Sequence, residues 1–95
     1  TSGTSGALVS AFMALLDRGD EAIIADPYFV MYPMLGALTG ATCVVCDTYP
    51  DFRMTAERVE RLITPRTRLV LLNSPGNPSG VVTSEREGRE LLELC

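Results

Sequence analysis

The sequence predicts an α/β fold, a three-layer α/β/α arrangement in which helices cover both faces of a mostly parallel sheet. Two observations carry this prediction: short, continuously apolar segments, and the segments between them, whose apolar residues recur at helical spacing. Alternation of this kind is typical of parallel strands joined by crossover helices. The expected order is one helix followed by three strand–helix units, with no internal repeat.

The first helix is expected over residues 5–17, where apolar residues recur at the spacing of one helix face. These residues are Leu8, Phe12, Leu15 and Leu16. Val9 and Met13 widen that face, which predicts burial on more than one side. Gly19 can take the left-handed conformation that commonly follows the end of a helix.

Three strands are expected at residues 21–25, 42–47 and 68–73, each short and rich in apolar residues. Pro27 closes the first, because proline has no N–H to donate to a strand ladder. We interpret Asp26 as an anchor of the turn before this proline.

Helices are expected between and after the strands, at residues 28–38, at residues 55–63 and from Ser84 onward. In the first of these, Pro33 is tolerable only near the first turn. Thr55 is a plausible N-cap of the second, with Val59, Leu62 and Ile63 on one face. Ser84, with Glu87 three residues later, has the spacing of a capping box.

Composition excludes several classes of protein. The net charge is −4 and all eight basic residues are arginines, which argues against nucleic-acid binding, since that requires a clustered basic surface. Nothing reaches the roughly 18 consecutive apolar residues of a membrane span. Three cysteines without histidine fit a reducing compartment, and cytoplasm is the expected location.

Two cysteines, Cys43 and Cys46, form a C-x-x-C pair within an expected strand. Residues three apart on a strand point to opposite faces, so these two cannot close on one metal ion. With no histidine and no second cysteine pair, we expect no metal site, and we interpret both cysteines as core residues. The three tyrosines and four methionines are likewise interpreted as packing residues, and Arg58, Arg61, Arg86 and Arg89 as solvated helix-face residues.

A ligand site is expected beyond the carboxyl ends of the strands, where open parallel sheets bind their ligands. Residues 1–6 are small and polar and lead into a helix, whose amino end would favour an anion such as a phosphate. An ordinary N-cap with two convenient glycines is the alternative. Residues 73–80 contain no apolar side chain other than proline, and a long polar connection is the alternative there.

These segments, with four others, resemble the class I/II aminotransferases among the fold-type-I pyridoxal-phosphate enzymes. The matching strings are Thr-Ser-Gly-Thr-Ser-Gly-Ala-Leu at 1–8, Gly-Asp-Glu at 19–21, Asp-Pro-Tyr-Phe at 26–29, Asp-Phe at 51–52, Thr-Pro-Arg-Thr at 64–67, and Asn-Ser-Pro-Gly-Asn-Pro-Ser-Gly-Val-Val at 73–82. They occur in the family's order, with near-family spacing, over essentially the whole chain.

The resemblance implies a role for five residues in binding pyridoxal 5'-phosphate (PLP). Gly3, Thr4 and Ser5 would hold the phosphate through backbone N–H groups and hydroxyls. Phe29 would stack on the pyridine ring, worth about 0.5–1.5 kcal/mol beyond burial. Asn77 would donate to the phenolic oxygen and so tune the cofactor electronically, next to an Asn77–Pro78 bond that is cis in relatives.

No catalytic residue is expected in this chain. The family's enzymes form a Schiff base through a lysine, and this chain contains no lysine. The chain starts in loop chemistry and ends inside a helical pattern. We therefore expect residues 1–95 to be a fragment of the large PLP-binding domain, with no internal boundary, inactive alone and poorly stable.

The resemblance implies that the parent protein transfers an amino group between an α-amino acid and a 2-oxo acid and forms a homodimer, without a nucleic-acid or membrane partner. Two alternatives stay open on the same scaffold, because fold does not fix chemistry. One is a PLP-dependent carbon–sulfur lyase. The other is the aminotransferase-like sensor domain of a transcription regulator, which would require a DNA-binding domain upstream of Thr1.

Overall fold

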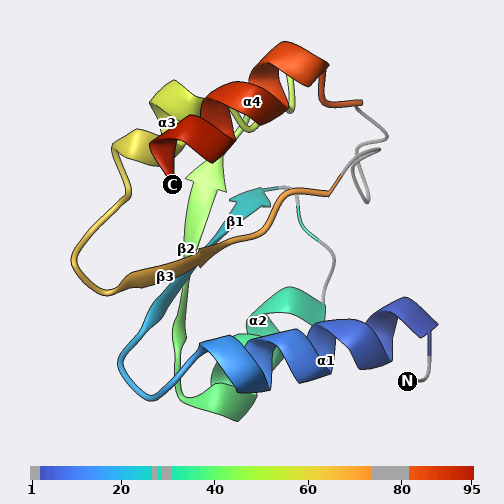
Figure 1. Cartoon of the computed structure of the whole chain (residues 1–95), viewed down its shortest axis with the longest axis vertical. Helices are drawn as coiled ribbons and strands as arrows, with labels where there is room; N and C mark the ends of the chain where they lie inside the picture. Colours follow the sequence, from blue (N-terminus) through green and yellow to red (C-terminus); the bar gives the residue numbers. More distant parts are fainter. Residues whose placement is uncertain (1–2, 27, 29–30, 74–81) are drawn as a thin grey trace.

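A three-stranded parallel sheet forms the centre of the molecule (Figure 1). The computed structural model describes residues 3–26, 28, 31–73 and 82–95. The strands are β1 (Glu21–Asp26), β2 (Thr42–Asp47) and β3 (Thr67–Val70), in the order β2-β1-β3. β1 pairs in parallel with both neighbours, so β2 and β3 are the edges of the described sheet.

Helices cover both faces of the sheet. Figure 1 shows α1 (Gly3–Leu15) and α2 (Met31–Thr39) on one side of it, and α3 (Ala56–Glu60) and α4 (Glu85–Leu94) on the other. The predicted three-layer α/β/α class and the predicted order of elements are therefore confirmed.

Two separate apolar cores result, because neighbouring residues on β1 point to opposite faces. Ala22 packs under α1 and α2 with Phe12, Leu16 and Leu35. Ile23, fully buried, packs on the other face. Its companions there are Cys46 of β2, Met54, Val59 of α3 and Leu91 of α4.

Helix α1 begins at Gly3, two residues before the predicted start, and ends at Leu15. The prediction that it is buried on more than one side is wrong for this chain, since Met13 is 62% and Leu15 55% exposed. The helical period places Phe12 and Leu16 toward the sheet, and it turns Met13 and Leu15 away from the sheet. Gly19 follows with φ of 89°, the predicted left-handed conformation.

Helix α2 begins three residues later than predicted, and Pro33 stands third in it, within the first turn as its missing N–H requires. Helix α3 is shorter than predicted. After Glu60 the backbone hydrogen bonds join residues three positions apart, as in a 3₁₀ turn. Leu62 N donates to Val59 O (2.9 Å) and Ile63 N donates to Glu60 O (3.3 Å). Ile63 is consequently 39% exposed instead of packed.

Both predicted caps are confirmed. The hydroxyl of Thr55 accepts a hydrogen bond from Arg58 N at the start of α3. At α4, Ser84 accepts from Glu87 N (3.1 Å) while Glu87 accepts from Ser84 N (3.0 Å), which completes the capping box. Each N-cap satisfies backbone N–H groups that the helix itself leaves without a partner.

The packing interpretation holds for some tyrosines and methionines only. Tyr32 and Met54 are buried, at 7% and 6% exposure. Four other residues are 38–66% exposed, which contradicts it: Tyr28, Tyr49, Met13 and Met34. They lie on sides of turns and helices that no other described element covers. Among the described helices, none has both the length and the apolar character that crossing a membrane requires.

Candidate functional site

The amino end of α1 is where the sequence predicts an anion site. Gly3 has φ of 65°, and among the described residues beyond its chain neighbours and its own helix backbone, no atom lies within 4 Å of the place where a Cβ would stand. The first turn contains no acidic residue, and Ser5 is exposed. The first four N–H groups of a helix lack intrahelical partners and carry its positive dipole end. Gly3, Thr4 and Ser5 form this turn, whereas the sequence predicted that Gly3 and Thr4 lie in the segment before the helix.

In the view of Figure 1, β2 ends toward the top, whereas β1 runs toward the side on which the amino end of α1 lies. β1 ends at Asp26 there, and the chain beyond β3 runs toward the same side. Phe29, Asn77 and the Asn77–Pro78 bond, the other predicted features of the site, lie outside the described residues.

The end of β1 is fastened to the residue that follows β2. Thr48, which is 1% exposed, donates from its hydroxyl to the carbonyl oxygen of Asp26 at 2.6 Å. Its backbone N–H donates to the same oxygen at 3.3 Å. Asp26 is therefore anchored before Pro27 through its main chain.

A turn at residues 48–53 follows β2 and is held by Arg58 of α3. The guanidinium Nη1 donates to the carbonyl of Thr48 (3.2 Å), to Asp51 Oδ1 (2.7 Å) and to the carbonyl of Arg53 (2.5 Å). Phe52 N also donates to Thr48 O at 2.7 Å. The interpretation of Arg58 as a simply solvated residue is thus wrong: its side chain is 26% exposed and its Nη1 contacts three oxygens.

Electrostatics follow from these contacts. The hydrogen bond from Arg58, followed by that from the backbone of Arg53, lowers the pKa of the Asp51 carboxyl. The same bond raises the pKa of Arg58. The pKa of Glu87 is lowered chiefly because its carboxylate accepts from the backbone of Ser84.

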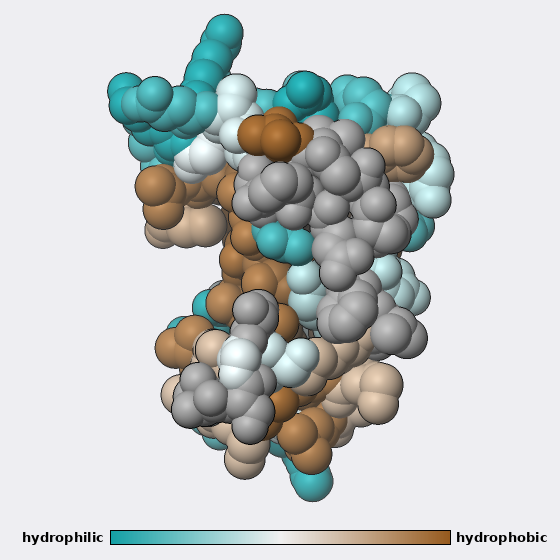
Figure 2. Space-filling model, turned by 90° about the vertical axis from the view of Figure 1, so that its right-hand side faces the viewer, coloured by the Kyte–Doolittle hydropathy of each residue, from teal (hydrophilic) through white to brown (hydrophobic). Residues whose placement is uncertain are grey.

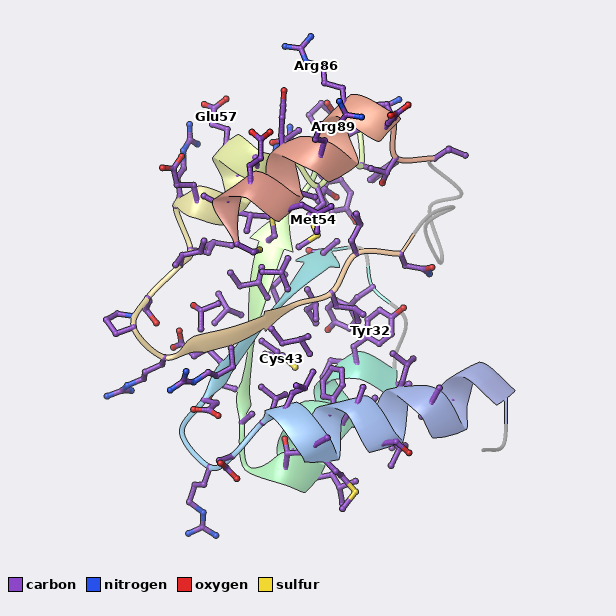
Figure 3. The ribbon with its side chains drawn as sticks, in the orientation of Figure 1. Tyr32, Cys43, Met54, Glu57, Arg86 and Arg89 are labelled. Atoms are coloured by element: carbon purple, nitrogen blue, oxygen red, sulfur yellow. The ribbon has the colours of Figure 1, made fainter. Side chains whose placement is uncertain are left out.

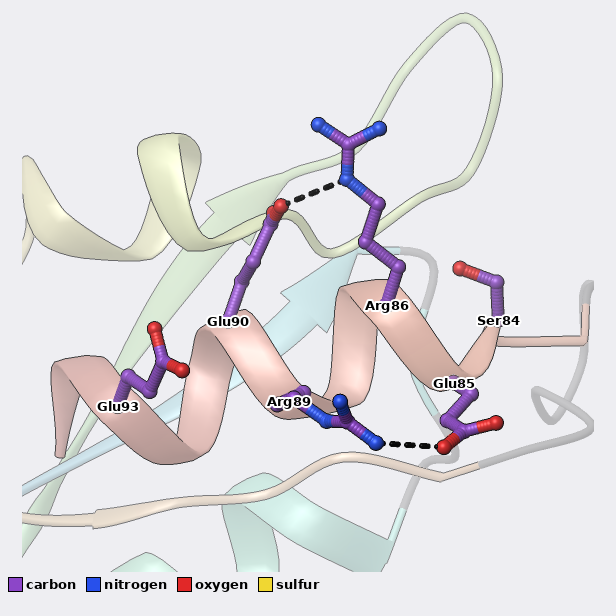
Figure 4. A pocket seen from close by; sticks show the side chains of 6 residues that line it. All are labelled: Ser84, Glu85, Arg86, Arg89, Glu90 and Glu93. Atoms are coloured by element: carbon purple, nitrogen blue, oxygen red, sulfur yellow. Dashed lines mark hydrogen bonds and ion pairs between the residues drawn. The ribbon is translucent and has the colours of Figure 1, made fainter.

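The other three arginines of the set do behave as solvated helix-face residues. Figure 4 shows two pairs on the outer face of α4, Arg89 with Glu85 (2.6 Å) and Arg86 with Glu90 (3.0 Å). Arg61 pairs with Glu57 on α3 in the same manner, at 2.7 Å. Exposed pairs of this kind contribute little stability.

The cysteines have structural environments. Cys46 is buried in the core under α3 and α4, whereas Cys43 faces α2, so the pair points to opposite faces as predicted. Burial raises the pKa of both thiols. Within the part of the chain that the structure describes, no group of three or more histidine, cysteine or acidic residues could hold a metal ion.

A groove of about 410 Å³ runs along β3 and is lined mainly by apolar side chains. Its lining includes Ile63, Leu69, Val70 and Leu94. Figure 2 shows hydrophobic side chains in a hollow between the two helical layers. The groove lies at an edge strand, and its polar lining residues are Thr67, Arg68 and Cys95.

A family model described as "Aminotransferase class I and II" matches residues 1–95, which is the whole chain. The chain belongs to this family. Aspartate aminotransferase of Rhizobium meliloti (strain 1021) is 47% identical over 94 residues, which are 97% of this chain and 23% of that protein. The probable aspartate/prephenate aminotransferase of Thermus aquaticus is 45% identical over 97 residues, covering 100% of this chain and 25% of that protein.

Solved aminotransferase structures have the same fold. The aspartate aminotransferase of Rhizobium meliloti superposes with a TM-score of 0.92 at 45% identity, over 99% of this chain and 24% of that one. The Thermus thermophilus aspartate aminotransferase with maleate gives 0.95 at 42% identity, over 99% and 25%. This aminotransferase chain therefore spans about a quarter of the length of the relatives it matches.

Sequence reasoning found the α1 turn but missed Thr48 and Arg58. Thr48 directly follows an expected strand, and parallel strands place their carboxyl ends side by side. That position was a usable signal for Thr48. Nothing in the sequence around Arg58 distinguishes it from the solvated arginines of the same helical pattern.

Proposed function

We propose that this chain is the cofactor-binding part of a PLP-dependent aminotransferase, which transfers an amino group between an α-amino acid and a 2-oxo acid. The observation that carries the proposal is the family match across residues 1–95. The open amino end of α1 supports it independently, because it has the chemistry of a phosphate site.

The first turn of α1 fits the phosphate of PLP. Its backbone N–H groups point out of the helix end, and the turn itself contains no acidic residue. Gly3, which is left-handed, has open space at the position of a Cβ. Gly3, Thr4 and Ser5 would bind the phosphate there with N–H groups and hydroxyls and so fix the position of the cofactor.

Phe29 and Asn77 complete the proposed set. Bound PLP supplies an electron sink for reactions at the α-carbon of an amino acid. Phe29 would bind one face of the ring and exclude water from it, and Asn77 would hold a proton toward the phenolic oxygen with its amide N–H. These two roles rest on the family resemblance of residues 26–29 and 73–82.

The reacting amine is proposed to lie outside this chain. The 95 residues contain no lysine, and the matched relatives are about four times as long, so the remaining length can supply it. The chain alone is then a binding element without a catalytic residue.

Substrate choice is also proposed to lie outside these residues. Relatives at similar identity are named for different substrates: an aspartate aminotransferase at 47%, an aspartate/prephenate aminotransferase at 45% and an arginine–pyruvate transaminase at 42%. A region shared to this extent by enzymes of different specificity is suited to holding the common cofactor.

Residues 1–95 are proposed to be one part of a large domain, without an internal boundary, in a cytoplasmic homodimer of amino-acid metabolism. The three free cysteines support a reducing compartment. Exposed apolar side chains support coverage by further structure, whether the same protein or a second subunit: Met13, Leu15, Met34 and Leu38.

The phosphate site can be tested by placing a carboxylate in the first turn of α1 of the full-length protein. Ser5→Asp favours the helix through its dipole but repels a phosphate. We expect PLP affinity to fall at least tenfold while affinity for pyridoxal, which has no phosphate, is unchanged. Ser10→Asp, an exposed position further along α1, is the matched control. Unchanged PLP affinity in Ser5→Asp would contradict the assignment.

The reaction is tested by incubating the full-length protein with PLP, a panel of α-amino acids and a 2-oxo acid acceptor. Appearance of the 2-oxo acid derived from the donor supports transamination. Release of a thiol or sulfide without amino transfer would show the carbon–sulfur lyase instead, and PLP binding without any turnover would favour the sensor domain.

A further inference from the structure

Thr48 is 1% exposed, so its hydroxyl is buried. Its hydroxyl donates to the carbonyl oxygen of Asp26 at 2.6 Å, and its backbone N–H donates to the same oxygen. A buried hydroxyl needs a partner, but many other acceptors would satisfy it. The acceptor of the Thr48 hydroxyl is the carbonyl of Asp26, the last residue of the central strand.

The end of β1 depends on this contact. Pairing with β2 ends at Asp26 opposite Asp47, and the next residue, Pro27, has no N–H with which to continue a ladder. On the β3 side, the paired register reaches Ile23, whose carbonyl accepts from Leu71 N. Within the described residues, the final carbonyl of β1 is therefore held from the β2 side, by Thr48.

Thr48 is itself fixed in place. Its own carbonyl accepts from Phe52 N at 2.7 Å and from Arg58 Nη1 at 3.2 Å. Arg58 is anchored in turn by Asp51. The hydroxyl that reaches Asp26 thus belongs to a cross-linked turn, which makes it a rigid reference point for the end of β1.

We propose that Thr48 is a positioning residue for cofactor binding, acting through the Asp26 carbonyl on the point where the chain leaves the sheet toward Phe29. The inference rests on the proposed function, in which Phe29 stacks on the cofactor ring. A stacking side chain keeps its geometry only if the backbone that carries it starts from a fixed point. Two bonds from one residue to one carbonyl supply that point.

The experiment uses the full-length protein with PLP as the probe. Thr48→Val keeps the shape of the side chain and removes its hydroxyl, so it should weaken PLP affinity by roughly three- to tenfold, the equivalent of one hydrogen bond. The circular dichroism band of bound PLP should shrink at saturation, because the ring is held less uniformly. Thr48→Ser keeps the hydroxyl and should retain the affinity and the band of the unsubstituted protein.

Leu91→Ala is the control for lost stability. It opens a cavity in the core beside α4 but removes neither hydrogen bond from Thr48 to Asp26, and it should lower the thermal transition without changing PLP affinity or the band. Thr48→Val with the PLP affinity and band of the unsubstituted protein would overturn the inference. So would a Thr48→Ser protein that loses PLP affinity, which keeps the test decisive where Thr48→Val does not fold.

A failure of the proposed function can be distinguished from a failure of this inference. An unsubstituted full-length protein that binds no PLP refutes the proposed function and this inference with it. A protein that binds PLP equally well with threonine or valine at residue 48 refutes this inference alone.

Discussion

The thiol sulfur of Cys43 lies 2.7 Å from the point that a Cβ atom on Gly36 would occupy. β2 and α2 therefore approach each other this closely only because residue 36 has no side chain. The same sulfur lies 3.5 Å from the carbonyl oxygen of Tyr32, to which the thiol donates. Figure 3 labels the side chains of both residues. Burial raises the pKa of Cys43, which keeps the thiol protonated and able to donate.

Gly36→Ala should destabilise the full-length protein by about 1–3 kcal/mol, because the added methyl group overpacks a well-filled contact. Thermal unfolding measures the effect. Gly88→Ala is the matched control: it lies in α4 with nothing within 4 Å of the added methyl group, and it should stabilise by about 0.4–1 kcal/mol. The double substitution Cys43→Ala/Gly36→Ala should regain most of the loss, and a double variant no more stable than Gly36→Ala would contradict overpacking against the Cys43 sulfur as the cause.

Arg58→Ala should destabilise by about 1.5–3 kcal/mol, the range for hydrogen bonds made by a charged group. In this variant, three oxygens of the turn at residues 48–53 lose the hydrogen bonds that they accept from Arg58 Nη1. Arg58→Lys should recover little, since an ammonium lacks the planar fork of arginine. Arg61→Ala removes an exposed pair with Glu57 and should stay within about 0.5 kcal/mol. Equal effects at both arginines in urea unfolding would refute the special role of Arg58.

Stability should fall in acid partly through Asp51 and Glu87. Both carboxyls have a pKa lowered from ordinary values of 3.8 and 4.5, by bonds from Arg58 and from the backbone of Ser84. A lowered folded-state pKa means that the contribution is present above these ordinary values and is lost as the pH falls through the folded-state pKa. The losses therefore begin near pH 4.5 and continue below it.

The measurement compares the thermal midpoint of Glu87→Gln with that of the unsubstituted full-length protein between about pH 7 and about pH 3. The difference should be largest at neutral pH and shrink below about pH 4.5 as Glu87 itself becomes neutral. Glu90→Gln, which removes only an exposed pair with Arg86, should show little difference throughout. A Glu87→Gln difference that stays constant over the whole range would exclude this titration.

The 95-residue chain alone should unfold without a sharp cooperative transition. Its described sheet has two open edges, β2 and β3, and β3 borders a groove lined by apolar residues such as Leu69 and Leu94. Calorimetry of the isolated chain checks this, and a sharp two-state transition would contradict it. Borohydride reduction in the presence of PLP should attach no cofactor to any side chain of this chain, because it contains no lysine.

Local patterns predicted the local structure well. The spacing of Ser84 and Glu87 indicated the capping box, Gly19 its left-handed turn, and residues 42–47 the full extent of β2. Each depends on a few neighbouring residues whose conformational preferences act in isolation. The start of α1 was predicted less well, because the helix already begins at Gly3, two residues before the expected position.

The failures arose where burial depends on distant segments. Met13 and Leu15 have the apolar character of core residues, yet the sheet covers only the face of α1 that carries Phe12 and Leu16. Helix α3 ends earlier than predicted, because its backbone changes to 3₁₀ hydrogen bonds after Glu60. No proline or glycine at that point of the sequence signals the change. Hydrophobicity predicts that a residue can be buried, whereas coverage by another element decides whether it is.

The sequence by itself determined the family and the α/β class, since these follow from motifs and from periodicity along the chain. Only the tertiary structure decided that Thr48 holds the carbonyl of Asp26 and that Arg58 holds the turn beyond β2. Those contacts join residues 22 and 10 positions apart, in a register set by strand pairing. The physical reason is that a hydrogen bond between two strand ends requires the sheet to exist first.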